Sequence, residues 1–144
     1  MSAEEEQNKA LIRRFYEEID KGNIDAMDEI VAEDYLNHDP PFPGLPSGRA
    51  GLKQVFKMFW ESTPGTHMIE DQIADGDKVV TRLRAQGRFE NALAGIPPTG
   101  KDMEVTAIAV HRVADGKIVE HWSEVDSAAL MAQLGLISLP EPPA

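Results

Sequence analysis

The sequence contains no cysteine in its 144 residues. This absence excludes disulfide bonds, thiol nucleophiles and cysteine-ligated metals, and it fits a cytoplasmic location, which we expect here. Positive charge is also scarce, because 14 Lys and Arg face 25 Asp and Glu and leave a net charge of -11. Such an acidic chain disfavours nucleic acid and anionic membrane surfaces as partners.

Long apolar runs and cofactor-binding motifs are missing as well. No segment approaches the roughly 20 apolar residues that span a bilayer, and the acidic start of the chain lacks the apolar stretch of a signal peptide. There is no P-loop, no dinucleotide fingerprint and no Gly-x-Ser-x-Gly. The four histidines do not show the i, i+4 spacing of a helical metal site, so we expect neither a metal nor a cofactor.

The first half of the chain shows helical periodicity. Apolar residues at i, i+4 and i+8 predict a helix over residues 3–21, and a second apolar stripe predicts a short helix over 24–31. Residues 34–48 form a loop rich in Pro and Gly, after which Ser47 can cap a third helix of about 48–62.

The second half of the chain has the character of an antiparallel meander. Asp-Gly pairs mark its hairpin turns, and a short helix over 127–134 closes it. Four strands are expected: 67–74, 77–90, 101–113 and 117–126. Helices followed by such a meander predict one α+β domain over 1–144, with a core of about 7–135 and a Pro-rich tail at 136–144.

The most informative segment is 116–126, whose strand pattern combines Trp122 and His121 with three carboxylates. A surface strand has no need of a tryptophan, and a core strand does not tolerate three unpartnered carboxylates. A strand that is half apolar and half polar is typical of the wall of a small-molecule site. It ends at Asp126, a candidate proton-transfer group.

Four stretches of the chain together resemble the SnoaL-like polyketide cyclase (ester cyclase) family of the NTF2-like, or cystatin-like, superfamily; they are 8–16, 37–40, 95–101 and 115–122. The resemblance implies a cone-shaped fold, with three N-terminal helices packed on a strongly curved antiparallel sheet. It also implies a homodimer through the outer sheet face. The activity it implies is cofactor-free acid/base chemistry alpha to a carbonyl of a small hydrophobic molecule, such as aldol-type cyclisation, isomerisation or dehydration.

The resemblance also assigns roles to individual residues. Asp126 matches the acid/base at the end of a late strand, and His111 is the nearest match to a second pocket group on the preceding strand. A ketosteroid-isomerase pattern is only partly present: Tyr16 and Asp39 match, but Ala109 replaces the second oxyanion donor. Steroid isomerisation is therefore not expected, whereas a dehydratase-like site that combines His and Asp stays open.

Strand alternation leaves the composition of the site undecided. On ideal pairing of the last two strands, His111 and His121 share one face, whereas Trp122 and Asp126 lie on the other. Only a bulge would bring His111 and Asp126 together. Asp126 can equally cap the helix that follows it.

Other candidate site residues lie in the predicted loop and on the helices. His38 is a candidate proton donor, and the expected substrate-binding residues are Tyr16, Asn37, Asp39, Phe59 and Trp122. Each has an ordinary structural alternative, in a turn or in the core. A non-catalytic small-ligand-binding or dimerisation module is the alternative function, and a structural domain with a collapsed cavity is a third possibility.

Overall fold

Helix α1 (Ala3–Asp20) opens the computed structural model, which describes residues 1–143. Its start is a capping box, in which the Ser2 hydroxyl accepts from the Glu5 backbone N–H at 3.1 Å and the Glu5 carboxylate accepts from the Ser2 N–H at 2.9 Å. Its buried side includes Ile12, Phe15 and Ile19. The prediction of a helix over 3–21 is confirmed.

The next segment departs from the prediction. A 3-10 turn (Ile24–Ala26) and helix α2 (Met27–Ile30) lead directly into strand β1 (Val31–Asn37), where we expected a helix to residue 31 and a loop from 34. β1 pairs in parallel with a strand more than 80 residues later in the chain, from Val31 opposite Ile118 to Asn37 opposite His121. That long-range pairing outweighs the local turn signal of the Pro-rich stretch that follows.

The remaining helices lie where the periodicity places them. Helix α3 spans Gly48–Ser62, and helix α4 spans Ser127–Gln133. Ser47 does occupy the N-cap position of α3, but its side chain makes no capping hydrogen bond.

The sheet contains five strands in the order β1-β5-β4-β3-β2. The four later strands form the expected antiparallel meander; they are β2 (Gly65–Asp75), β3 (Lys78–Arg88), β4 (Asp102–Ala114) and β5 (Lys117–Val125). Because β1 joins β5 in parallel, the sheet is mixed, which corrects the prediction of a purely antiparallel sheet.

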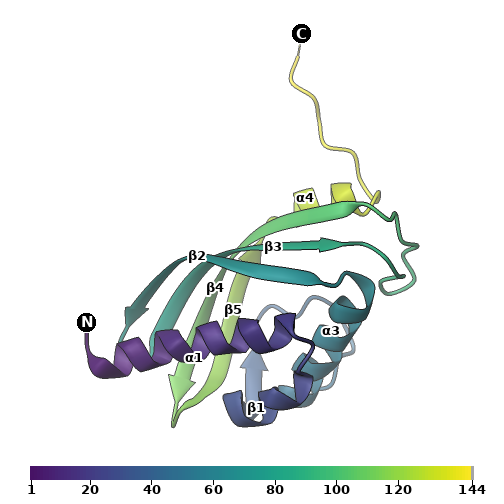
Figure 1. Cartoon of the computed structure of the whole chain (residues 1–144). Helices are drawn as coiled ribbons and strands as arrows, with labels where there is room; N and C mark the ends of the chain where they lie inside the picture. The colour runs from purple at the N-terminus through teal and green to yellow at the C-terminus, as the bar shows by residue number, and fades with distance from the viewer. Residues whose placement is uncertain (144) are drawn as a thin grey trace.

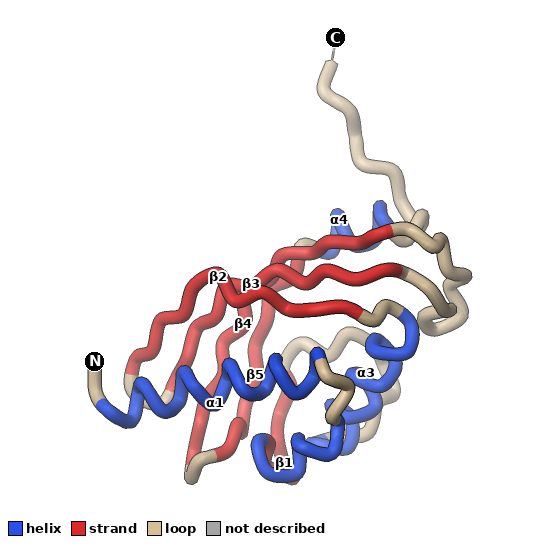
Figure 2. Tube along the Cα trace, viewed as in Figure 1, coloured by secondary structure: helices blue, strands red, loops and turns tan. Residues whose placement is uncertain are grey.

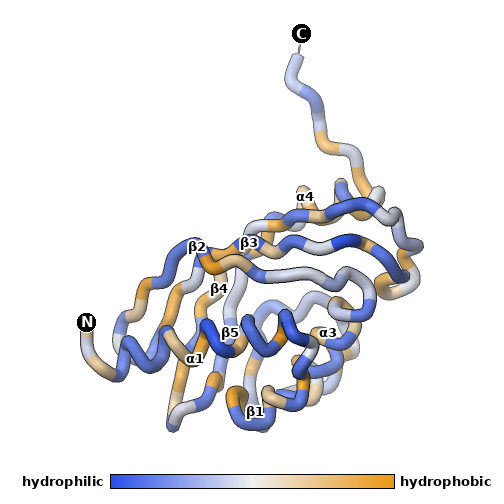
Figure 3. The backbone as a smooth tube through the Cα atoms, viewed as in Figure 1, coloured by the Kyte–Doolittle hydropathy of each residue, from blue (hydrophilic) through white to orange (hydrophobic). Residues whose placement is uncertain are grey.

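The sheet curves around α1 and α3, which lie on its concave side (Figures 1 and 2). Apolar and polar residues alternate along the strands (Figure 3), as expected when one face is buried and the other meets solvent. The main core fills the concave side between α1 and the sheet, and its members include Ile12, Phe15, Val79, Leu83 and Ile118.

A second apolar cluster lies at the other end of the sheet. It contains Phe89, Leu93, Met103 and Leu134, which bring the 89–101 loop and α4 against β4. After α4 the chain extends away from the domain (Figure 1). Among the described residues, none of the helices is both long and apolar enough to cross a membrane.

Candidate functional site

The register between β4 and β5 decides which side chains reach the concave side. Val110 pairs with Trp122 and His111 with His121. The two-residue turn at Asp115-Gly116 and a register shift next to Val113 produce this alignment. His111 and Trp122 therefore lie on opposite faces of the sheet, as strand alternation predicts.

Two stacked histidines form the centre of the concave side. The rings of His111 and His121 lie 4.7 Å apart with an angle of 16° between their planes, and His111 is fully buried. Neither ring nitrogen of His111 has a hydrogen-bond partner within residues 1–143, and His121 Nδ1 has none either. Each unpaired buried polar atom costs roughly 1–3 kcal/mol, and native proteins contain few of them. These nitrogens are therefore candidates to bind a ligand.

Aromatic rings lie on both sides of the histidine pair and form a row with it. Phe15 contacts His111 edge-on at 5.4 Å, and Tyr16 lies 6.2 Å from the same ring. On the β1 side, Tyr35 stacks on His121 at 6.4 Å, and its hydroxyl has no partner within residues 1–143. The pair therefore lies among apolar surfaces and phenol groups, a mixed environment of the kind found in small-molecule sites.

Burial keeps both imidazoles neutral. It lowers the pKa of His111 well below its ordinary value, and the neighbouring His121 lowers it further. Burial also lowers the pKa of His121 to about 4, although the Asp39 carboxylate acts in the opposite direction. Burial raises the pKa of Tyr16 and of Tyr35, so both phenols keep their protons. Each neutral imidazole can donate one hydrogen bond and accept another.

Asp126 lies away from this pair, at an exposed position where β5 ends and α4 begins. Its Oδ1 accepts a hydrogen bond from the Ala129 backbone N–H at 3.1 Å, which makes it the N-cap of α4. Within residues 1–143 no hydrogen bond joins Asp126 to His38 or to His111, the two groups with which we expected it to act.

His38 belongs to a separate cluster on the outer face of the sheet. Its ring stacks on Trp122 at 4.6 Å and 4°, and its Nε2 donates to Glu120 Oε2 at 2.9 Å. Arg112 Nε donates to the other oxygen of Glu120 at 2.6 Å. These two hydrogen bonds lower the pKa of the Glu120 carboxyl, and the one from His38 has the larger effect. The structure thus places Trp122 and His38 together, on the face opposite the buried histidines.

The other expected substrate-binding residues make structural contacts in different parts of the molecule. Asn37 Oδ1 accepts from the Asp39 N–H at 2.9 Å, and Asp39 Oδ2 accepts from the Ser123 N–H at 2.9 Å, which ties the loop after β1 to β5. Phe59 stacks on Phe42 at 5.9 Å beside the second apolar cluster. Among the predicted site residues, only Tyr16 and His111 lie together on the concave side.

His121 was missing from the predicted site, although its signal is present in the sequence. It shares the face of His111 by strand alternation, and a polar residue opposite a polar residue on a core-facing surface is uncommon. Helical spacing does not reveal the pair, because the two histidines lie on neighbouring strands. Within the described residues, no group of three or more His, Cys, Asp or Glu side chains could hold a metal ion.

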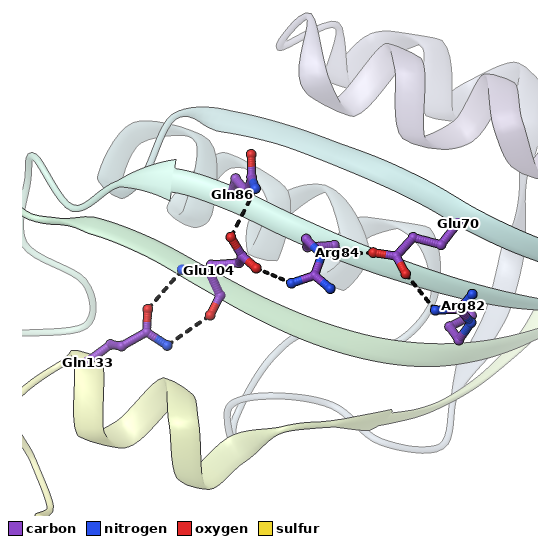
Figure 4. Close-up of polar contacts among 6 residues, drawn as sticks. All are labelled: Glu70, Arg82, Arg84, Gln86, Glu104 and Gln133. Carbon is purple, nitrogen blue, oxygen red and sulfur yellow. Dashed lines mark hydrogen bonds and ion pairs between the residues drawn. The ribbon is translucent and has the colours of Figure 1, made fainter.

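An ion-pair network crosses the outer face of the sheet (Figure 4). Arg84 contacts both Glu70, at 2.7 Å, and Glu104, and Arg82 donates to Glu70 at 2.5 Å. The Gln133 side chain from α4 forms two hydrogen bonds of 2.8 Å with the Glu104 backbone. Beside this network lies an open groove of about 580 Å³, lined by Gln86, Gly87, Arg88, Asp102, Met103, Glu104 and Gln133.

A second groove, of about 350 Å³, lies between α1 and the β4–β5 turn and is lined by Glu4, Gln7, Asn8, Leu11, Val113, Ala114, Asp115 and Gly116. Neither groove is lined by His111 or His121.

Comparisons with known proteins agree with this architecture. TsrD from Streptomyces laurentii shares the fold, with a TM-score of 0.83 at 24% identity over 95% of this chain and 99% of that one. Wild-type IdmH from Streptomyces antibioticus is 34% identical, with a TM-score of 0.76 over 90% of this chain and 99% of that one. These likenesses confirm the predicted cone-shaped, NTF2-like α+β class.

Sequence relatives are similar over most of their length. Aklanonic acid methyl ester cyclase DnrD from Streptomyces peucetius is 30% identical over 131 residues, which cover 87% of this chain and 88% of that protein. Nogalonic acid methyl ester cyclase from Streptomyces nogalater is 28% identical over 116 residues, with 79% and 87% covered. The profile of the SnoaL-like polyketide cyclases matches residues 10–134. The chain belongs to the SnoaL-like polyketide cyclase family.

Proposed function

We propose that this protein closes a ring in a small, polyketide-like carbonyl compound by intramolecular aldol condensation, without a cofactor. The observation that carries this proposal is the buried pair of neutral imidazoles, His111 and His121: both ring nitrogens of His111 and Nδ1 of His121 lack partners within residues 1–143. The activities named for the sequence relatives, which are cyclases of methyl esters, support the same reaction class.

The chemistry needs a hydrogen-bond donor at the place where negative charge develops. Removal of a proton alpha to a carbonyl leaves an enolate oxygen, which a fixed donor in a dry site stabilises far better than water does. A neutral imidazole N–H of His111 or His121 suits this role, and the protonated phenols of Tyr16 and Tyr35 lie beside the pair. The surrounding rings supply an apolar surface for the ligand.

The acid/base group is a separate part of the proposal. Family resemblance assigns it to Asp126, whose carboxylate caps α4 through one oxygen. Capping does not prevent proton transfer, because a carboxylate has two oxygens.

Aklanonic acid methyl ester and nogalonic acid methyl ester, the compounds in the names of the relatives, are the first probes for turnover. Chromatography separates the open and ring-closed isomers. We expect His111→Leu to reduce kcat by about 10²- to 10³-fold, the usual loss when one oxyanion donor is removed. His38→Leu, on the outer face, is the matched control and should retain wild-type turnover. Wild-type kcat in a folded His111→Leu protein would contradict the assigned donor.

A non-catalytic ligand-binding domain is the second candidate, favoured by the exposed position of Asp126 and by its hydrogen bond as the N-cap of α4. This alternative predicts calorimetric binding of the same methyl esters without conversion, and an affinity dominated by Trp122.

The assembly and location of the protein also belong to the proposal. We expect a cytoplasmic homodimer that pairs through the outer sheet face, where Ile73 and Ile108 are 61% and 48% exposed. Light scattering should then give twice the chain mass of 15.9 kDa, and a mass of one chain would exclude the dimer.

A further inference from the structure

Asp20 and His67 form a clamp at the end of α1. Asp20 Oδ1 accepts a hydrogen bond from His67 Nδ1 at 2.6 Å, and Asp20 Oδ2 accepts from the His67 backbone N–H at 2.9 Å. Both side chains are largely shielded, with 19% of Asp20 and 25% of His67 exposed. One carboxylate therefore fixes both the backbone and the ring of the same residue.

This clamp determines which nitrogen of the neutral imidazole carries the proton. Because an ionised carboxylate can only accept, the neutral imidazole carries its proton on Nδ1, and Nε2 of that tautomer presents a lone pair. Nε2 makes no hydrogen bond within residues 1–143, and the ring is not fully buried. A histidine held by a carboxylate at one nitrogen, with the other nitrogen available, is the arrangement that makes imidazole an effective base.

Strand register places this base on the same side of the sheet as the buried histidines. Ile69, two residues after His67, pairs with Leu83, which belongs to the core. Because side chains alternate, His67 shares the concave face with Ile69. Its ring lies 5.2 Å from that of Tyr16, which in turn lies 6.2 Å from His111. His67 thus stands at one end of the row of rings.

We propose that His67 accepts the proton alpha to the substrate carbonyl and that Asp20 is its positioning residue. This proposal rests on the ring-closing function proposed above, and it gives His67 the proton-transfer role that the family resemblance assigns to Asp126, whose carboxylate caps α4. The C–H bond breaks, the proton moves to His67 Nε2, and the electron pair forms an enolate. The enolate carbon then attacks a second carbonyl of the same molecule to form the new C–C bond. The proton returns from Nε2 to the resulting alkoxide, so atoms and charge balance without a co-reactant.

His67 has a hydrogen-bonded carboxylate partner, which His111 lacks. No carboxylate is hydrogen-bonded to His111 within residues 1–143, and burial lowers its pKa, so an imidazolium there would be costly. At His67 the Asp20 carboxylate stabilises the positive charge that proton transfer creates. The titratable groups in contact with the His67 ring are Asp20 and Tyr16, both from α1, while the paired residue on β3 is Ala85.

The first test compares His67→Gln and Asp20→Asn with the wild-type protein on aklanonic acid methyl ester, over pH 5 to 9. Loss of a general base reduces kcat by about 10²- to 10⁴-fold, so we expect His67→Gln to fall in that range with little change in KM. We also expect the acidic limb of its pH profile to disappear. Arg82→Gln is the control, because it removes a cation paired with a carboxylate on the outer face. Wild-type kcat and pH profile in His67→Gln would overturn the proposal.

A second measurement follows proton abstraction alone, as deuterium incorporation from D₂O at the alpha carbon of the same ester. If wild-type protein catalyses exchange without ring closure and His67→Gln does not, the ring-closing function fails but the base assignment holds. If His67→Gln closes the ring normally, the base assignment fails and the function holds. If wild-type protein catalyses neither step, both are overturned.

Discussion

At the scale of single residues, Asp126 combines two properties that the sequence could not separate. It ends a late strand, as a proton-transfer residue would, and it precedes a helix, as a capping residue would. The structure shows the second role directly, through its hydrogen bond to the Ala129 backbone. The first role stays a prediction, and it can be tested because Asn caps helices about as well as Asp.

Asp126→Asn and Asp126→Ala form an informative pair of substitutions. Asp126→Ala removes the cap and should lower the free energy of unfolding by about 1 kcal/mol, whereas Asp126→Asn should change it by a few tenths. Urea unfolding measures both. If Asp126 is the acid/base, both variants lose turnover; if capping is its whole contribution, Asp126→Asn keeps wild-type turnover.

At the scale of elements, β1 and α3 depend on partners that are distant in the chain. β1 is a strand because β5 offers it a parallel partner, although the local pattern predicts the end of a helix at Val31 and the start of a Pro-rich loop at Asp34. α3 starts directly after that loop, and Gly51 is buried where the two meet. A Cβ at Gly51 would lie 2.0 Å from the Pro46 carbonyl oxygen, so the loop and the helix fit only without a side chain there.

Gly51→Ala should therefore destabilise the protein, although Gly to Ala inside a helix normally stabilises it by up to about 1 kcal/mol. We expect a loss of roughly 1–3 kcal/mol, because the backbone of the loop must shift to admit the methyl group. The midpoint of urea unfolding measures the effect. Gln54→Ala, exposed on the same helix, should change stability by less than about 0.5 kcal/mol. A stabilised Gly51→Ala protein would contradict the close packing.

At the scale of the whole molecule, the buried histidines make folding sensitive to acid. Folding holds His111 and His121 neutral, whereas the unfolded chain binds protons at both as the pH falls through their ordinary value of 6.5. The unfolded state then binds more protons than the native state, so stability falls as the pH is lowered. For His121, the loss develops between pH 6.5 and about 4.

The contribution of His121 to this loss should be about 2 kcal/mol, after allowance for the partial exposure of its ring. Urea unfolding at several pH values between 4 and 7 checks the prediction. Wild-type stability should decline across this range, and the decline should be smaller in His121→Asn. His38→Asn, on the outer face, should keep the wild-type pH dependence. Equal slopes in all three proteins would show that His121 does not cause the decline.

Local patterns in the sequence are sufficient to predict the periodic elements. Helical spacing predicted α1, α3 and α4 within a few residues, and Asp-Gly turns with alternating strands predicted β2 to β5, because these signals depend on neighbours in the chain. Alternation across the last hairpin also separated His111 from Trp122 correctly. The family resemblance then predicted the cone-shaped α+β class.

Contacts between distant side chains depend on the tertiary structure. The parallel pairing of β1, the stacking of His38 on Trp122 and the clamp between Asp20 and His67 join residues 47 to 87 positions apart. No local pattern encodes such contacts, because they arise from the curvature of the sheet and the placement of α1 across it. Burial of His111 and exposure of Asp126 also follow from the curvature of the sheet and the placement of α1. The sequence therefore predicts a site at the end of β5, whereas the structure places the candidate site at the row of rings between α1 and the sheet.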